Sequence, residues 1–185
     1  MTHFSLSTSL GAFAVASLLG ITVPAWVNAN EVTPPVLMAQ RQTLTEAQVK
    51  NLLATLRTAE DAEDIEQLKS LLAPFIVSEI TVESGANSTT QVMEGISSHS
   101  QLWEAIYRLI ESQDLLNEKT EIRFVDDGKM AVVTRFSVET LTLTDQRQMM
   151  ALAKDVIRIA LIDGEPKIVS VKTNGWLESR PSDEE

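Results

Sequence analysis

The sequence contains no cysteine and only two histidines, His3 and His99. The absence of cysteine excludes disulfide bonds, thiolate metal sites and cysteine nucleophiles. Basic residues are also scarce, because 15 Lys and Arg residues stand against 26 Asp and Glu residues, for a net charge of −11. Nucleic acids and anionic membrane surfaces attract clustered positive charge, so we expect neither as a partner.

The first 29 residues contain no Lys, Arg, Asp or Glu, and residues 9–22 form an apolar run. This run has the length of a signal-peptide core and is shorter than the ~20 residues that a membrane-spanning helix needs. The small residue Ala29 stands where a signal peptidase would cleave. We therefore predict a signal peptide at residues 1–29 and a periplasmic or secreted product. An uncleaved anchor is the alternative, because the segment has no positively charged start.

The rest of the chain divides by composition. Residues 30–43 contain two adjacent prolines and no periodicity, which predicts a linker. Residues 178–185 are polar and half of them are acidic, which predicts a disordered acidic tail. Residues 44–177 have the apolar content and regular patterning of one domain.

Two helices are expected at the start of this domain. Thr45 and Gln48 have the spacing of a capping box, and apolar residues then recur at helical intervals. Asp64 is placed to cap a second helix, which we expect Pro74 to end. The acidic run between these helices, which includes Glu60, is predicted to be a solvated junction.

A β-hairpin and a third helix follow. Residues 75–84 and 89–94 are rich in β-formers around a Gly-Ala-Asn-Ser turn. Ser98 and Gln101 have the spacing of another capping box, which predicts a helix ending near Asp114. His99 would then lie on the exposed first turn of that helix.

The C-terminal part of the domain reads as four antiparallel strands in series. Asp127-Gly128 and Asp163-Gly164 are strong hairpin signals, because Gly adopts positive φ freely. The two middle strands are about 14 residues long, which predicts that they bend. The apolar face changes sides within residues 130–143, so we expect a β-bulge near Glu139 or Thr140.

This order of elements resembles the nuclear transport factor 2-like superfamily. The resemblance covers residues 44–177 and includes "LLATLRTAEDAEDIEQLKSLLAP", "VMEGISSHSQLWEAI" and "DVIRIALIDGEPKIVSV", the last similar to the closing hairpin of that superfamily. Pro166 stands where relatives commonly have an aromatic residue. The resemblance implies an α+β fold in which three N-terminal helices pack in a strongly bent antiparallel sheet, a cone-shaped cystatin-like barrel with a short hairpin between the second and third helices.

Four charged residues interrupt the apolar inner strands: Arg135, Glu139, Asp155 and Arg158. One interpretation places them on an outer, solvated or dimer-forming sheet face as cross-strand ion pairs. The other places Asp155, Glu139 and Arg135 inside the cone as candidate catalytic residues, because a buried carboxylate can act as a general base. Asp155 is the strongest of the three, since its strand face continues with isoleucines toward an apolar interior.

Three aromatic residues are candidates for ligand binding. Trp103 and Tyr107 have helical spacing, so they either belong to the core or line a pocket. Trp176 follows Asn174-Gly175 at the end of the sheet, where it would contact a ligand or close the mouth of the cone.

Members of one superfamily can have many different functions, so the function of this chain must be inferred from its site residues. The first hypothesis is an exported, non-enzymatic module that binds a small apolar ligand in the cone or associates with itself through the sheet as a homodimer. The alternative is a small lyase or isomerase that uses a carboxylate base in the cone. The sequence predicts neither a metal site nor a cofactor.

Overall fold

The structure is a computed structural model and describes residues 43–179. The predicted signal peptide, all of the predicted linker except residue 43 and most of the acidic tail lie outside these residues. Within residues 43–179, no helix is long and apolar enough to cross a membrane.

Helix α2 (Glu46–Asp61) begins with the expected capping box, in which the Thr45 hydroxyl accepts from the Gln48 backbone N–H and the Gln48 side chain accepts from the Thr45 N–H. Helix α3 (Ile65–Ser70) is capped by Asp64, also as expected. It ends before Pro74, which instead lies in a segment of β1 that has no partner on β2. Pro74 has no register partner on β6 either, so its missing N–H breaks no ladder hydrogen bond.

The sheet has six strands in the order β2-β1-β6-β5-β4-β3. Their bounds are β1 Leu72–Ser84, β2 Asn87–Glu94, β3 Ile110–Val125, β4 Met130–Leu143, β5 Gln148–Ile162 and β6 Glu165–Ser179. Strands β3 to β6 form the expected antiparallel meander. The sheet as a whole is mixed rather than antiparallel, because β1 pairs with β6 in parallel.

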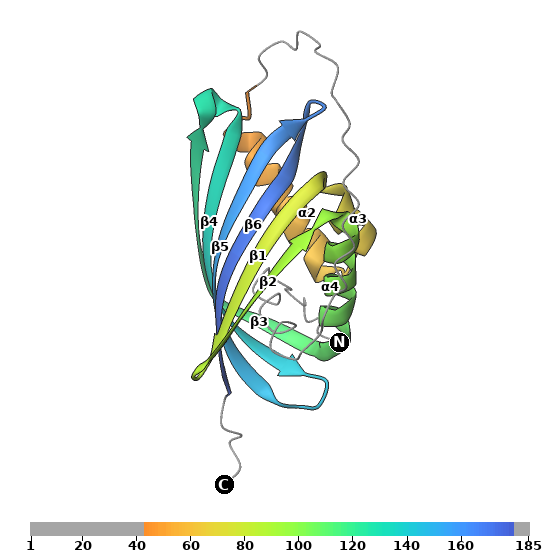
Figure 1. Cartoon of the computed structure of the whole chain (residues 1–185), viewed down its shortest axis with the longest axis vertical. Coiled ribbons are helices and arrows are strands. Elements are labelled where there is room, and N and C mark those ends of the chain that lie inside the picture. The colour runs from red at the N-terminus through yellow and green to blue at the C-terminus, as the bar shows by residue number, and fades with distance from the viewer. Residues whose placement is uncertain (1–42, 180–185) are drawn as a thin grey trace, which may run out of the picture.

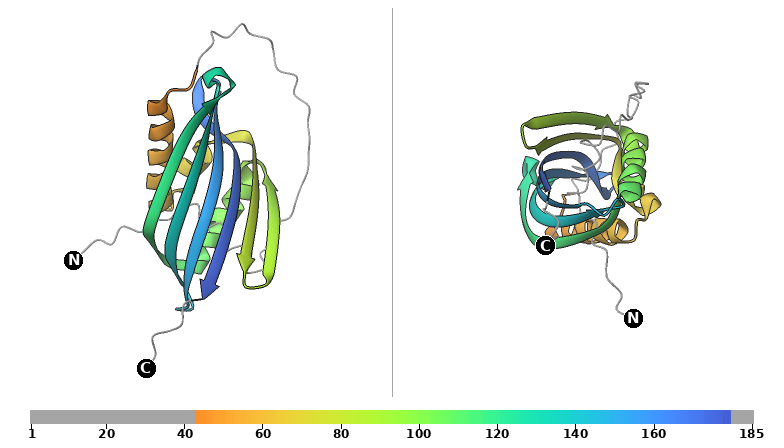
Figure 2. Two further views of the ribbon diagram at one scale, coloured as in Figure 1. Left: turned by 90° about the vertical axis from the view of Figure 1, so that its left-hand side faces the viewer. Right: turned by 90° about the horizontal axis from the view of Figure 1, so that it is seen from below.

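The sheet is strongly curved. Figures 1 and 2 show the long strands wrapping around one side of the molecule, with α2, α3 and α4 (Gly95–Leu109) on the concave side. The two hairpin signals were correct: Asp127 and Gly128 lie between β3 and β4, and Asp163 and Gly164 between β5 and β6, all with positive φ. This curvature directs alternate side chains of each strand into the space beneath the helices.

Three local predictions were wrong. Helix α4 begins at Gly95 rather than at Ser98, and Ser98 donates to the Glu94 carbonyl instead of capping the helix. The helix also ends at Leu109, because the following residues pair with β4 as the long strand β3. Finally, β4 has no bulge at Glu139 or Thr140. The register shift lies on β3, between Leu115, which pairs with Glu139, and Asn117, which pairs with Val138.

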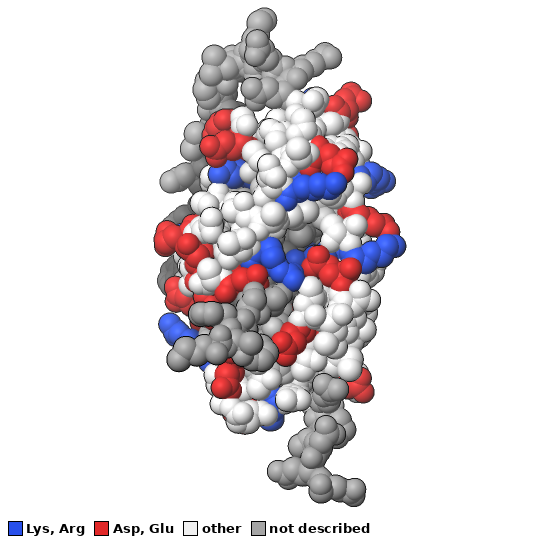
Figure 3. Space-filling view, turned by 180° about the vertical axis from the view of Figure 1, so that it is seen from behind, with Lys and Arg blue, Asp and Glu red and all other residues white. Residues whose placement is uncertain are grey.

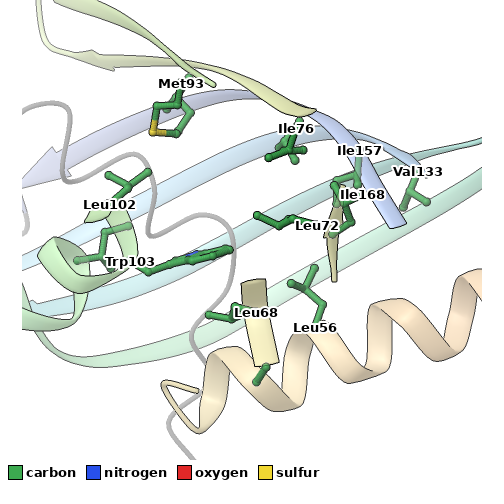
Figure 4. Packing of buried hydrophobic residues seen from close by; sticks show 14 of the residues in the cluster. Leu56, Leu68, Leu72, Ile76, Met93, Leu102, Trp103, Val133, Ile157 and Ile168 are labelled. Carbon is green, nitrogen blue, oxygen red and sulfur yellow. The ribbon is translucent and has the colours of Figure 1, made fainter. Parts of the chain in front are cut away.

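The core fills the space between the helices and the concave face of the sheet. Figure 4 shows core side chains from each helix pointing toward strand side chains: Leu56, Leu68 and Trp103 from the helices, and Leu72, Ile76, Val133, Ile157 and Ile168 from the sheet. The Trp103 indole points from α4 toward the strands.

The face seen in Figure 3 carries acidic side chains with basic ones beside several of them, without a broad patch of one sign.

Candidate functional site

One row of polar residues crosses the concave face of the sheet. Thr120, Arg135, Asp155 and Thr173 lie directly opposite one another in the registers of β3, β4, β5 and β6. Arg135 is 7% exposed and Asp155 is fully buried. Three neighbouring strands thus place one buried polar side chain each at the same level of the interior, whereas Thr120 on the edge strand is exposed.

Arg135 and Asp155 form a buried ion pair. The guanidinium donates from Nε and Nη2 to Asp155 Oδ2 at 3.2 and 3.1 Å, and Thr173 Oγ1 donates to Oδ1 at 2.7 Å. Burial alone would lower the pKa of Arg135, but Asp155 and nearby carboxyl groups outweigh it and raise that pKa. Both oxygens of Asp155 are therefore engaged, which makes this residue better suited to holding Arg135 than to accepting a proton from a substrate.

Glu139 lies on the same face of β4 as Arg135 and is fully buried. Gln113 of β3 donates a hydrogen bond from Nε2 to its Oε2 atom. Burial raises the pKa of Glu139 to about 7, although the positive charge of Arg135 opposes this shift. The interpretation of these charges as outer-face ion pairs is thus wrong for Arg135, Glu139 and Asp155, whereas Arg158 does lie on the outer face.

Glu60 is a third interior carboxyl group, at the end of α2. It is 2% exposed, so the prediction that it lies in a solvated junction was wrong. Neither of its carboxyl oxygens has a hydrogen-bond partner among the residues that the structure describes. Burial raises its pKa to about 8, despite the positive charges of Arg135 and Arg57. Glu60 is therefore largely protonated at neutral pH.

The candidate aromatic residues lie in different places. Trp103 is buried against the core, and the Tyr107 hydroxyl is buried without a hydrogen-bond partner among residues 43–179. Burial, with the charge of Glu60, raises the Tyr107 pKa far above its ordinary value. Trp176 does not face the interior. It is 44% exposed on the outer face, where its indole N–H donates to Glu83, because residues of β6 alternate between the two faces.

His99 is buried rather than exposed, because α4 starts one turn earlier than predicted. Its Nδ1 lies 2.7 Å from the Gly95 carbonyl, which can only accept, so Nδ1 carries the proton. Its Nε2 then accepts from the Ser78 hydroxyl, also at 2.7 Å. Burial lowers the pKa of His99, which favours this neutral tautomer.

Two cavities border the interior groups, and a third of about 290 Å³ lies beside Trp176. A central one has only about 10 Å³ of free space and is lined by Ser78, Ile80, His99, Trp103 and Thr173 with four aliphatic residues, among them Leu56. A larger groove of about 340 Å³ lies between α2 and the strands β3 and β4. It is lined by Leu53, Ala54, Leu56, Arg57, Glu118, Thr120, Val133 and Arg135. Leu56 borders both cavities, so its side chain separates the groove from the interior.

The groove has the volume expected of a small-molecule site. Its walls are partly apolar, and Arg135 connects it to the buried pair with Asp155. Within residues 43–179, no group of three or more His, Asp or Glu side chains is arranged to hold a metal ion.

Several of these residues were not predicted from the sequence. Gln113 and Glu118 were missed because residues 110–119 were expected to be helix and loop, although they pair with β4. Ser78 carried no signal beyond its place in a strand. The burial of Glu60 could have been predicted, because it follows Leu56 by four residues and so continues the apolar stripe of α2.

No family model matches the sequence, and no curated protein matches it. Solved structures do match the fold. A hexachlorocyclohexane dehydrochlorinase (LinA type 2) is 13% identical with a TM-score of 0.59, covering 74% of this chain and 88% of its own. A candidate dehydratase of the nuclear transport factor 2-like family from Streptomyces avermitilis is 15% identical, with a TM-score of 0.53 over 69% and 94% of the two chains.

A ketosteroid isomerase-like protein from Erwinia carotovora atroseptica is 11% identical, with a TM-score of 0.52 over 70% of this chain and 94% of its own. Identities this low show the fold and not the activity. The chain has the nuclear transport factor 2-like fold that the resemblance implied, an α+β cone with a strongly curved sheet, although this sheet is mixed rather than antiparallel.

Proposed function

We propose that this chain is an exported binding protein that holds a small, largely apolar molecule in the groove between α2 and β3–β4. The observation that carries this proposal is the groove of about 340 Å³, whose lining includes Leu53, Ala54, Leu56 and Val133. Such a combination of apolar walls and a few polar groups is typical of small-molecule sites. Export is proposed from the uncharged, apolar start of the sequence.

A fluorescent titration tests this function. N-phenyl-1-naphthylamine, a neutral apolar probe, should bind the purified protein with a saturable increase in fluorescence. Ala54 lies on the exposed rim of the groove, so Ala54→Trp should fill it and weaken binding at least tenfold. Equal binding by Ala54→Trp would contradict the proposal. Native mass spectrometry of protein isolated from its own source would show whether a ligand is carried.

A second candidate function is a lyase or isomerase reaction with an interior carboxyl group as the acid or base. Two buried carboxyl groups favour it, because the pKa of Glu139 is raised to about 7 and that of Glu60 to about 8. Values near neutrality suit proton transfer. If turnover of any candidate substrate is detected, Glu139→Gln and Glu60→Gln should each lower kcat at least a hundredfold, and unchanged turnover in both would exclude this mechanism.

Self-association through the outer sheet face is proposed alongside ligand binding. Phe136, Leu152 and Trp176 are 42%, 39% and 44% exposed on neighbouring strands of that face. A second copy of the chain would cover them. Light scattering after size exclusion should give a dimer mass at micromolar concentration and a monomer mass for Phe136→Glu. A monomer mass for the wild type would refute the homodimer.

A further inference from the structure

Two arginines converge on one carboxylate oxygen in the lining of the groove. Glu118 Oε2 lies 3.2 Å from Arg57 Nη1 and 4.0 Å from Arg135 Nη1. The first contact is a hydrogen bond, whereas the second is too long to be one. The Arg135 fork uses Nε and Nη2 for Asp155, so its Nη1 group faces Glu118 without bonding to it.

Arg135 is fixed in this position, but Glu118 is not. The side chain of Arg135 is 8% exposed and held by the fully buried Asp155. The side chain of Glu118 is 31% exposed, on a strand that forms one edge of the sheet. Within the described part of the chain, Glu118 accepts only a hydrogen bond from Arg57 and one of 3.4 Å from Thr120, so it can turn toward solvent once another anion replaces it, which would leave two arginines facing the groove.

We infer that the ligand of the groove carries an anionic head group, a carboxylate or sulfonate, which binds between Arg57 and Arg135 in place of the Glu118 carboxylate. This inference rests on the proposed function, because it specifies the ligand of the same groove. The exchange replaces one negative charge by another. A neutral or cationic head group would instead leave the two guanidinium groups without their shared partner, which is unfavourable above all for Arg135, whose side chain is 8% exposed.

The walls of the groove define the rest of the ligand. Leu53 and Ala54 provide accessible apolar surface beside the two arginines, and the buried Leu56 and Val133 complete the apolar lining. A volume of about 340 Å³ accommodates a small ligand rather than a long acyl chain. The ligand class is thus a small organic acid with a compact aromatic or aliphatic body.

A matched pair of probes tests the head group separately from the apolar body. The fluorescent compound 1-anilinonaphthalene-8-sulfonate differs from N-phenyl-1-naphthylamine by one sulfonate, which stands in for the ligand's anionic group. The wild type should bind the sulfonate at least fivefold more tightly than the neutral probe. Ala54→Trp reports whether each probe occupies the groove, and Phe136→Ser reports any binding on the outer face.

Three further variants assign the effect to the two arginines. Arg57→Gln should weaken sulfonate binding about fivefold or more and leave neutral-probe binding unchanged. Glu118→Gln should tighten sulfonate binding several-fold, because the competing carboxylate is gone. Lys50→Gln is the control, since it removes a positive charge from α2 at a side chain that is 63% exposed and paired with Glu46 rather than with the groove.

The outcomes separate the two ideas. If both probes occupy the groove with equal affinity, or if Arg57→Gln and Glu118→Gln affect neither, the anionic head group is refuted and the binding function stands. If Ala54→Trp changes the binding of neither probe, the proposed function fails, and the inference fails with it.

Discussion

Arg135 on β4 and Asp155 on β5 lie directly opposite each other in the antiparallel ladder, and two nitrogens of the guanidinium donate to a single oxygen of the carboxylate. The pair is closed on its far side by Thr173, which donates to the other oxygen. A charged pair in this position is held by three strands at once and links the groove to the centre of the fold.

Removing one member of this pair should destabilise the protein strongly. Asp155→Asn leaves a buried guanidinium without its counter-ion, and the expected loss in the free energy of unfolding is about 3 to 5 kcal/mol. The double variant Arg135→Met with Asp155→Leu removes both charges and should recover most of the loss. Urea denaturation measures all three proteins. A double variant as unstable as Asp155→Asn would show that packing, not the unpaired charge, is responsible.

Stability should fall as the pH rises, because of Glu60. Its carboxyl group has an ordinary pKa of 4.5 when exposed and of about 8 when folded. Between these values the folded chain binds more protons than the unfolded one, so the contribution is full below pH 4.5 and is lost as the pH rises through 8. Glu60→Gln should raise the free energy of unfolding at pH 8.5 by about 1 to 3 kcal/mol.

Thermal melts between pH 5 and pH 9 would measure this effect. Glu139 acts in the same direction, because its folded pKa of about 7 is also raised, so Glu60→Gln should reduce the pH dependence without abolishing it. The matched control is Glu66→Gln on α3, a side chain that is 84% exposed. Identical pH profiles for Glu60→Gln and the wild type would contradict the burial of an uncompensated carboxyl group.

The Ser78–His99 pair predicts a pH dependence of the opposite sign. Burial lowers the folded pKa of His99 below its ordinary 6.5, so below pH 6.5 the unfolded chain takes up more protons. This contribution to stability is therefore present above pH 6.5 and is lost as the pH falls. Titration of the His99 ring by NMR should show a midpoint below that of a model peptide.

Removing the hydroxyl tests the pair itself. Ser78→Ala leaves the buried Nε2 atom of His99 without its donor, which should cost about 1 to 3 kcal/mol. A change near zero in chemical denaturation would show that Nε2 finds another partner.

Gly95 should resist substitution for reasons of backbone conformation alone. Its φ is +74°, and a Cβ atom added there would meet nothing within 4 Å. Gly95→Ala should therefore lower the free energy of unfolding by about 1 kcal/mol through the left-handed conformation, with no steric clash. Gly95→Asn should be milder, since Asn tolerates this region better. Equal losses for both would argue for a rearranged start of α4.

The sequence predicted the parts of this fold that depend on neighbouring residues. The capping box of Thr45 and the turn at Asp163-Gly164 are local, and the structure contains both. The inward position of Asp155 was one of the two interpretations that the sequence left open, and the alternation of its strand agrees with it. The sheet curvature followed from the resemblance of the whole element order.

The sequence did not predict the features that depend on distant pairing. Residues 110–119 form a strand because β4 provides a partner, which no local propensity indicates. The inner face of β4 is polar at Arg135 and Glu139. The bulge was predicted on the assumption that inward-facing residues are apolar, which does not hold at these two positions. The burial of Glu60 also depends on distant pairing, because charged residues around it, such as Arg135, come from other elements.

The parallel pairing of β1 with β6 also bears on how the chain folds. Glu79 and Lys172, which form an ion pair across these strands, are 93 residues apart in the sequence. Contacts this distant close slowly, because a long loop must be ordered before they form. The β1–β2 hairpin can join the rest of the sheet only after β6 has been synthesised. A nascent chain therefore cannot complete its sheet before residues 165–179 have left the ribosome, so β1 and β2 wait for their partner strand.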